Sequence, residues 1–367
     1  GLSAPNRTMI ARKSTVAKIP IKPEGFMRVG CARSRAKKMG TNPSVARRPF
    51  RQTGPQEVCT EMSPIWPSPA LRVIERGWLS SNHLLGFDED GATVVDTGYV
   101  TDGDETVRLI DVALEGRPLR RIVNTHLHSD HAGGNALLQA RHGCAIWIPP
   151  GEHEAVAEWD EDRLSYRATS QLCPRFRHDH VFQPHDTLRL GGEDWTVLPA
   201  AGHDHAMVML WCERLGVLAS ADALWQTSFG VIFPELAGVS GFAEQGATLD
   251  LIADLDPRWV IPGHGAPFHE VAPSLAAARS RLQWLQNEPR RHTDHALKVL
   301  LAFKLLEARH MSLAELTAVV QASHDAMPGV RAHLSDDVAA LTARLADQLV
   351  RSGVAAWQDG RLVARAG

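Results

Sequence analysis

Hydrophobic and polar positions follow two different rhythms through the middle of the chain. Short runs that are apolar throughout or at every second position predict β-strands, and runs with apolar residues three and four positions apart predict helices. We expect strands within 71–79, 82–87, 92–98, 120–126, 144–150, 186–192, 194–203, 206–222 and 258–265, and helices within 105–116, 133–143 and 248–256. Strands interleaved with helices are typical of a mixed α/β domain whose sheets are covered by helices.

The pattern changes after Pro267, where helical spacing continues almost to the end of the chain. Ser312, followed by Glu315 three residues later, predicts a capping box at a helix start. Asp359-Gly360 predicts a final hairpin. Several helices followed by a hairpin resemble a small winged-helix domain, and we expect a winged-helix-like domain here. The predicted helices lie within 274–287, 294–310, 312–320 and 335–353.

Charge separates the first 54 residues from the rest of the chain. They hold 13 of the 39 lysines and arginines and one of the 42 acidic residues, a net charge of +12, so the remainder carries a net charge of −15. This basic segment lacks apolar periodicity and fits a disordered arm, a targeting peptide or a product of start-site choice. We favour the last, because Met62 directly precedes the first globular pattern. Residues 1–62 are therefore expected to be a disordered or non-native extension.

Composition excludes a disordered, fibrous or membrane-spanning protein. The 367 residues are 44% hydrophobic and 22% charged, as in ordinary globular domains. No uncharged apolar run approaches the ~18 residues that a membrane span needs, and no export signal is evident. The five cysteines are widely spaced and form no C-x-x-C pair, so we expect them to be reduced in a cytoplasmic protein.

Histidine and aspartate gather in Asn124–Gly134, which reads NTHLHSDHAGG and lies between a predicted strand and a predicted helix. A loop at this position frees side chains from strand alternation, so they can converge. Imidazole and carboxylate are ligands suited to zinc and, less selectively, to iron or manganese. Further candidates follow later strands. Together the candidate metal ligands are His126, His128, Asp130, His131, His203, Asp222 and His264.

The order of these motifs, His-x-His-x-Asp-His, Gly-His, Asp and Gly-His, resembles the metallo-β-lactamase superfamily over roughly residues 70–270. Asp96, in Val-Asp-Thr-Gly, is similar to that family's early strand-ending Asp-x-Gly. The resemblance implies an αββα sandwich, with a two-metal site at one sheet edge and Asp96 hydrogen-bonded to the ligand loops. By motif position, one metal takes His126, His128 and His203, the second takes Asp130, His131 and His264, and Asp222 bridges them.

The third motif is two residues shorter than the family's usual Gly-His-Thr-Pro-Gly-His. His205 therefore stays an alternative ligand to His203, and we expect it to support the ligands or line the pocket. Residues 225–230 are expected to form either a pocket wall or ordinary packing. A substrate-covering loop is expected in the excursion between the second and third motifs, which carries Trp159, Tyr166 and Phe176.

The expected chemistry follows from two divalent metal ions, zinc in the first place with iron or manganese as alternatives. Such ions lower the pKa of a shared water toward about 7 and polarise the bond under attack. Asp130 is placed to orient that hydroxide, so we assign it a catalytic role. An aspartate at the bridging position is typical of hydroxyacylglutathione hydrolases (glyoxalase II), lactonases and RNA-processing nucleases rather than of antibiotic-cleaving members.

We therefore expect a hydrolase in which a metal-bridging hydroxide attacks an ester or thioester of a small molecule. The alternatives are a metal-dependent nuclease, a non-catalytic metal-containing DNA-binding regulator, and an iron-dependent oxygenase on the same scaffold. Residues 291–367 carry nine basic and eight acidic residues, which gives no basic face for phosphate binding. We expect no nucleic-acid or membrane partner and leave a homodimer open. The expected domains are 1–62 (extension), 63–270 (catalytic) and 271–367 (C-terminal).

Overall fold

The structure is a computed structural model that describes residues 68–334 and 337–365. The predicted extension, residues 1–62, lies outside the described residues. All described residues belong to one compact unit. Within 68–334 and 337–365, no helix has the length and apolar character needed to span a bilayer. Three cysteines of this part of the chain, Cys144, Cys173 and Cys212, are buried and free, in line with the expectation for them.

The first sheet has six strands in sequence order, β1 to β6. β1 and β2 pair antiparallel, as do β2 and β3, while β3 to β6 run parallel to one another. A hairpin joins β2 and β3, and Asp88 and Gly91 pair at its end. The strands are β1 Leu71–Ile74, β2 His83–Asp88, β3 Gly91–Val95, β4 Leu119–Val123, β5 Ala145–Ile148 and β6 His180–Val181.

The second sheet has five strands in the order β11-β10-β9-β8-β7. β7 to β10 form an antiparallel meander, and β11 adds to β10 in parallel. Because β8, β10 and β11 point the same way, their carboxyl ends lie at one edge of the sheet. The strands are β7 Thr187–Leu190, β8 Glu193–Pro199, β9 Val208–Cys212, β10 Val217–Ala221 and β11 Trp259–Pro262.

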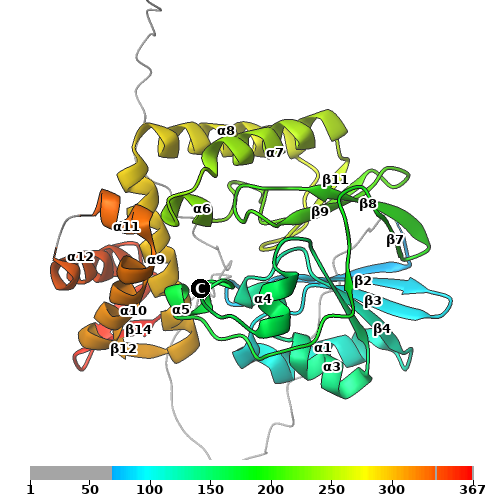
Figure 1. The fold of residues 1–367 in the computed structure, drawn as a ribbon, viewed down its shortest axis with the longest axis horizontal. Coiled ribbons are helices and arrows are strands. Elements are labelled where there is room, and N and C mark those ends of the chain that lie inside the picture. Colours follow the sequence, from blue (N-terminus) through cyan, green and yellow to red (C-terminus); the bar gives the residue numbers. More distant parts are fainter. Residues whose placement is uncertain (1–67, 335–336, 366–367) are drawn as a thin grey trace, which may run out of the picture. The chain divides into compact units, whose positions relative to one another are not determined.

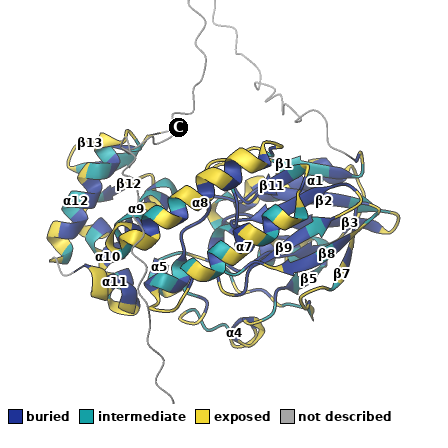
Figure 2. Ribbon diagram, turned by 90° about the horizontal axis from the view of Figure 1, so that it is seen from above, coloured by how far each residue is buried: buried dark blue, intermediate teal, exposed yellow. Residues whose placement is uncertain are grey.

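Helices cover the outer faces of both sheets, which confirms the αββα sandwich (Figure 1). α1 (Gly103–Leu114) and α3 (Asn135–His142) pack on the first sheet, and α7 (Phe242–Leu255) and α8 (Val271–Asn287) pack on the second. Figure 2 shows α7 and α8 with exposed residues along their outer side. Apolar side chains from both sheets meet between them, with Trp195 fully buried among them.

Short helical segments stand in the connections around the sandwich. They are η1 Val100–Asp102, α2 Ser129–Ala132, α4 His153–Glu158, α5 Tyr166–Thr169 and α6 Phe233–Leu236. α2 begins directly after the first histidines of the 124–134 segment, so the chain turns there from strand β4 into helix. α6 follows β10 and lies beside the C-terminal helices in Figure 1.

The C-terminal region contains the predicted helices and hairpin. Ser312 and Glu315 form the predicted capping box at the start of α10. A third, antiparallel sheet, in the order β12-β14-β13, includes a short strand that the sequence did not predict. The assignment of this region to the winged-helix class, and the domain boundary at residue 270, stay predictions. The elements are α9 Pro289–Ala308, β12 His310–Ser312, α10 Leu313–Ala326, α11 Pro328–His333, α12 Val338–Arg351, β13 Ala355–Gln358 and β14 Arg361–Ala364.

Candidate metal centre

All seven side chains proposed from the sequence as metal ligands converge at the strand ends between the two sheets. Each comes from the loop that follows a strand: β4 for the 126–131 cluster, β8 for His203, β10 for Asp222 and β11 for His264. The ligand atoms form three groups, in each of which they lie within 4.8 Å of one another. The groups are His126 with His128 and His203, His126 with His131 and Asp222, and Asp130 with His131 and His264.

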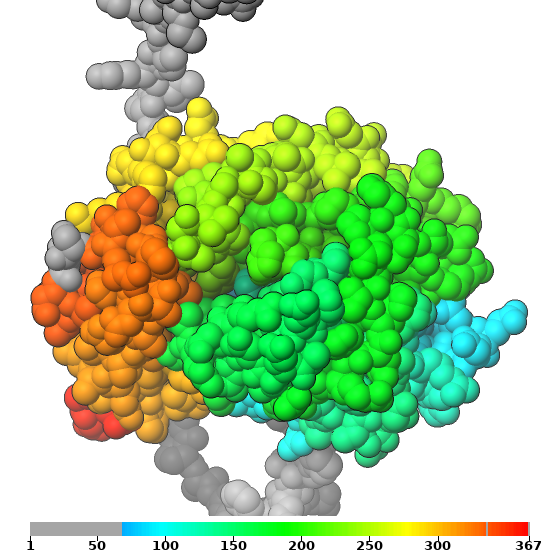
Figure 3. All heavy atoms as spheres, viewed as in Figure 1, coloured from blue at the N-terminus to red at the C-terminus, as the bar shows by residue number. Residues whose placement is uncertain are grey.

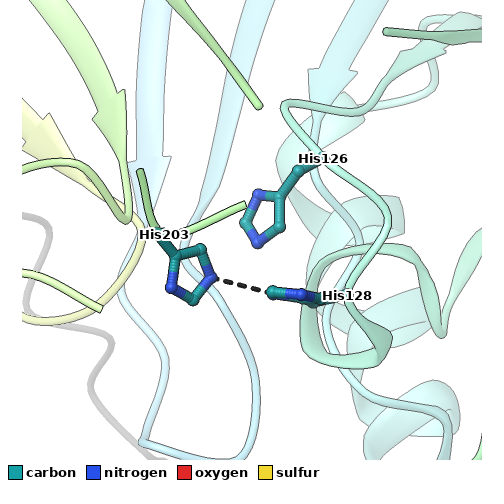
Figure 4. A group of neighbouring side chains, drawn as sticks. All are labelled: His126, His128 and His203. Carbon is teal, nitrogen blue, oxygen red and sulfur yellow. Dashed lines mark hydrogen bonds between the residues drawn. The ribbon is translucent and has the colours of Figure 1, made fainter. Parts of the chain in front are cut away.

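The first group consists of three imidazoles that face a common point (Figure 4). His128 Nδ1 lies 2.8 Å from His203 Nε2. The ring of His126 stands nearly perpendicular to both neighbours, with centroids 4.7 Å from His128 and 5.0 Å from His203. Three nitrogen donors in this arrangement suit an ion with tetrahedral preference, such as zinc.

Asp222 reaches both sides of the cluster. Its Oδ1 lies 3.5 Å from His131 Nε2, while its Oδ2 lies 3.5 Å from His203 Nε2 and 4.0 Å from His264 Nε2. One carboxylate therefore touches the histidine group on one side and the Asp130 group on the other. Gly263 makes room for it, because a Cβ at this position would collide with Asp222 Oδ1.

Hydrogen bonds on the outer ring nitrogens direct the inner nitrogens of three histidines into the cluster. His131 Nδ1 donates to Asp96 Oδ2 at 2.8 Å, and His126 Nδ1 lies 3.1 Å from the hydroxyl of Thr125. Both rings keep a buried Nε2 that has no hydrogen-bond partner. His203 Nδ1 donates to the carbonyl oxygen of Val231 at 2.6 Å, which points its Nε2 into the cluster. Buried polar atoms rarely stay unpartnered, so the Nε2 atoms of His126 and His131 fit metal coordination.

The negative charge of the buried carboxylates in the cluster also favours the binding of cations. Asp96 and Asp222 are each 3% exposed and share the site with Asp130. Burial opposes protonation of His131, but Asp96, Asp222 and Asp130 together raise its pKa well above the usual range. Burial and the neighbouring His203 lower the pKa of His128 to about 4, so this imidazole is neutral at pH 7 and available as a ligand. Several buried carboxylates beside neutral imidazoles fit divalent cations.

Asp96 ties the first ligand loop to the end of β3. Besides His131, it accepts hydrogen bonds from the backbone nitrogen of Thr125 at 2.9 Å and from the Thr125 hydroxyl at 2.8 Å. Behind it, Thr97 and Asn124 both donate to the carbonyl oxygen of His131. The sequence pointed to Asp96 but not to Thr97, Asn124 or Thr125, because their side chains are common in structural turns.

A second carboxylate that the sequence did not single out lies behind His128. Asp204 Oδ2 is 3.7 Å from His128 Nε2, on the opposite side of the ring from His203. Glu152 lies close by, buried and with an unpartnered oxygen, and burial together with the charge of Asp204 raises its pKa. His205, the alternative ligand, is outside the three groups: its side chain is 66% exposed and 3.8 Å from Asp204.

The excursion between the second and third motifs packs beneath the ligand loop. Tyr166 and Phe176 are buried in the core of the first sheet, with Trp159 packed against them, so these three side chains are not a cover over the site. The hydroxyl of Tyr166 donates to the carbonyl oxygen of Leu127 at 2.7 Å. In Figure 3 the surface is hollowed between α6 and the segment that carries α4 and α5.

Comparison with known proteins places the chain in a family. The sequence profile of the metallo-beta-lactamase superfamily matches residues 76–264. The hydroxyacylglutathione hydrolase of Rhodobacter capsulatus is 32% identical over 175 residues, which cover 47% of this chain and 59% of that protein. The hydroxyacylglutathione hydrolase of Methylococcus capsulatus is 27% identical over 175 residues, which cover 48% of this chain and 58% of that protein. The chain thus spans less than two thirds of the length of these relatives.

Among solved structures, the fold is similar to a beta-lactamase domain protein from Burkholderia ambifaria. The TM-score is 0.49 at 22% identity, and the match covers 81% of this chain and 94% of that one. The superfamily profile covers more than half of the chain, from the loop after β1 to the histidine after β11. The chain belongs to the metallo-beta-lactamase superfamily.

Proposed function

We propose that the protein is a hydrolase that uses two divalent metal ions, zinc in the first place, to cleave an ester or thioester of a small molecule. The observation that carries the proposal is the convergence of five imidazoles with the carboxylates of Asp130 and Asp222, in which the buried Nε2 atoms of His126 and His131 have no hydrogen-bond partner. Membership of the superfamily supports a hydrolase in general. The relatives named hydroxyacylglutathione hydrolase favour a thioester among the possible substrates.

When bound, two such ions supply Lewis acidity toward the substrate oxygen and a hydroxide at neutral pH. The residues of this chain that would hold them are His126, His128 and His203 on one side and Asp130, His131 and His264 on the other, with Asp222 between them.

Hydrogen bonds within the chain orient the side chains that would hold the metal ions. Asp96 fixes the tautomer and the orientation of His131, and the Val231 carbonyl does the same for His203. The side chain of Asp130 is 16% exposed, against 5% for Asp222, and it accepts from His264 Nε2 at 3.1 Å. Asp130 is therefore the carboxylate best placed to accept a hydrogen bond from the attacking water.

The test combines metal analysis with a hydrolysis screen. Protein purified without added metal is analysed for zinc, iron and manganese, and is assayed on thioesters, lactones, phosphodiesters and single-stranded RNA. We expect about two ions per chain, in keeping with paired sites of this kind, and turnover of a thioester or a lactone. Full metal content with cleavage of RNA alone, or iron without any hydrolysis, would overturn the proposal in favour of a nuclease or an oxygenase.

Two histidines two positions apart provide a matched pair for the ligand assignment. His203→Ala removes an imidazole from the cluster, so we expect loss of bound metal. His205→Ala removes an exposed ring, and we expect it to keep the wild-type metal content. The reverse result would make His205 the ligand of the third motif.

A further inference from the structure

Two tryptophans stand against one of the candidate ligands. The indole of Trp78 is stacked on the imidazole of His264, with centroids 5.6 Å apart and planes 14° apart. Trp225 meets both rings edge-on, 5.3 Å from Trp78 and 5.6 Å from His264. Trp78 is nevertheless 58% exposed. A large planar apolar surface thus faces solvent beside His264.

The loop that carries Trp78 is fixed to the site itself. Ser80 N donates to Gly77 O at 3.3 Å and closes a turn around the tryptophan. The next two residues then bind the ligand loops: Ser81 N donates to Asp130 O at 2.9 Å, and Asn82 N donates to Gly263 O at 2.7 Å. The exposed position of Trp78 is therefore set by the same contacts that position Asp130 and His264.

The arginine of this loop turns the other way. The side chain of Arg76 is only 7% exposed and lies 3.7 Å from Asp102, and it hydrogen-bonds to His83 and Thr106. The guanidinium of Arg76 is thus bound inside the fold. The side chain that this loop places beside the candidate ligands is therefore the apolar ring of Trp78. Trp225 is held as well, because its Nε1 donates to Asp222 Oδ1 at 3.2 Å.

A third aromatic ring borders the cluster at the histidine group. Phe233 stands edge-on to His128, with centroids 4.8 Å apart, and lies 5.7 Å from His203. Phe233 is half-buried under the C-terminal helices. The candidate ligands therefore have aromatic surface at both ends, and its exposed part is Trp78, which lies beside the half-buried Trp225.

We infer that Trp78 and Trp225 form a recognition surface for a planar apolar group of the substrate, next to the ester or thioester bond. The inference rests on the proposed function and narrows its substrate class to esters or thioesters with an aryl or similar apolar substituent on the half that lies toward His264. An offset aromatic stack in a fixed geometry stabilises a bound ring beyond simple burial of its area. The two indole rings carry no positive charge that could pair with a carboxylate of a polar substrate.

The test compares substrates that differ only in the apolar group. One pair consists of phenylacetyl and acetyl thioesters of the same thiol, and a second pair varies the leaving group, phenyl against methyl, at a fixed acyl group. In one of the two pairs we expect the wild-type protein to prefer the aryl member by about tenfold in kcat/KM, and Trp78→Ala to abolish most of that preference. Trp78→Phe should restore part of it.

Trp357→Ala is the matched control, since Trp357 is 40% exposed but belongs to the C-terminal hairpin. A second readout does not depend on turnover: titration of phenylacetate followed by tryptophan fluorescence. We expect saturable quenching in the wild type and in Trp357→Ala, and its loss in Trp78→Ala. Equal aryl preference and equal quenching in all variants would overturn the inference. Failure of every ester and thioester would instead refute the proposed function, while phenylacetate binding would still test the recognition surface.

Discussion

A buried histidine outside the set of candidate ligands makes the stability of the fold sensitive to acid. His292 lies on α9, is 2% exposed, and its Nε2 accepts a hydrogen bond from the backbone nitrogen of Ile232 at 3.2 Å. Burial, followed by the charge of Arg281, lowers its pKa from 6.5 to about 4. The neighbouring carbonyl, that of Val231, accepts from His203, so His292 supports the segment that orients a candidate ligand.

The sign and size of the effect follow from this shift. The unfolded chain binds a proton at position 292 near pH 6.5, whereas the folded chain does so only near pH 4, so protons favour unfolding between these values. The contribution of His292 is fully present above about pH 6.5 and is lost as the pH falls. Between pH 7 and pH 5 the loss amounts to about 2 kcal/mol in the free energy of unfolding.

The assay is urea unfolding of the wild type and of His292→Gln at pH 7 and at pH 5. Glutamine keeps an acceptor for Ile232 N but does not titrate, and taking the difference between the two proteins cancels the other histidines. We expect the wild type to lose about 2 kcal/mol more than the variant on acidification. An equal loss in both proteins would refute the reasoning, since it would mean that His292 is protonated in the folded state as readily as in the unfolded chain.

Two further substitutions test the surroundings of the cluster. Gly263→Ala places a Cβ against Asp222 Oδ1, so we expect it to lower the metal content measured by elemental analysis; wild-type content would show that the loop gives way. Asp204→Asn removes the carboxylate 3.7 Å from His128 Nε2, and we expect metal affinity, measured by competition with a chelating dye, to fall about 10–100-fold. Unchanged affinity would mean that Asp204 does not act through His128.

Local sequence signals predicted the fold where an element is long or its turn chemistry is distinctive. α1 follows from apolar residues at helical spacing, and its inner face packs on the first sheet as such a pattern requires. The C-terminal hairpin follows from Asp359-Gly360, whose φ angles of 48° and 73° are those of a turn that favours such residues. In both cases the information lies within a few neighbouring residues.

Short elements escaped prediction because distant contacts stabilise them. β12 has three residues and exists by pairing with β14, about fifty positions further along the chain. β6 has two residues, held by β5. α8 shows the same limit: its spacing predicted a helix, but only the structure shows that this helix packs with α7 on the second sheet. A pattern read along the chain identifies a helix but not the surface that the helix covers.

The sequence predicted the site residues that lie in dense histidine and aspartate motifs. It did not predict the residues that support the site through contacts between distant parts of the chain. The 126–131 cluster and the later glycine-flanked histidines stand out from any structural pattern, and the structure brings them together. Asp204 carries no such signal, because a lone aspartate next to a histidine is ordinary in a turn. Trp78 is a single aromatic residue between two strands, and only the fold reveals that its ring lies on His264.

The C-terminal region reaches the ligand loops along two routes. On α9, Lys304 donates to the carbonyl oxygen of Ser170, and on α10, Ser323 donates to that of Ala168, both at 2.8 Å. These bonds hold the chain around α5, where Tyr166 in turn binds the backbone of Leu127, between two candidate ligands.

The second connection starts at His292, which accepts a hydrogen bond from Ile232 N. The preceding residue, Val231, accepts a hydrogen bond from His203. Both routes end on backbone next to imidazoles of the same group, the one that contains His128 and His203. Neither set of hydrogen bonds, around α5 or at Ile232, is expected of a region whose only role is to bind a separate partner. Because ligand geometry must be held closely for a metal site to work, this architecture favours a C-terminal region that is part of the framework of the site over an appended binding module.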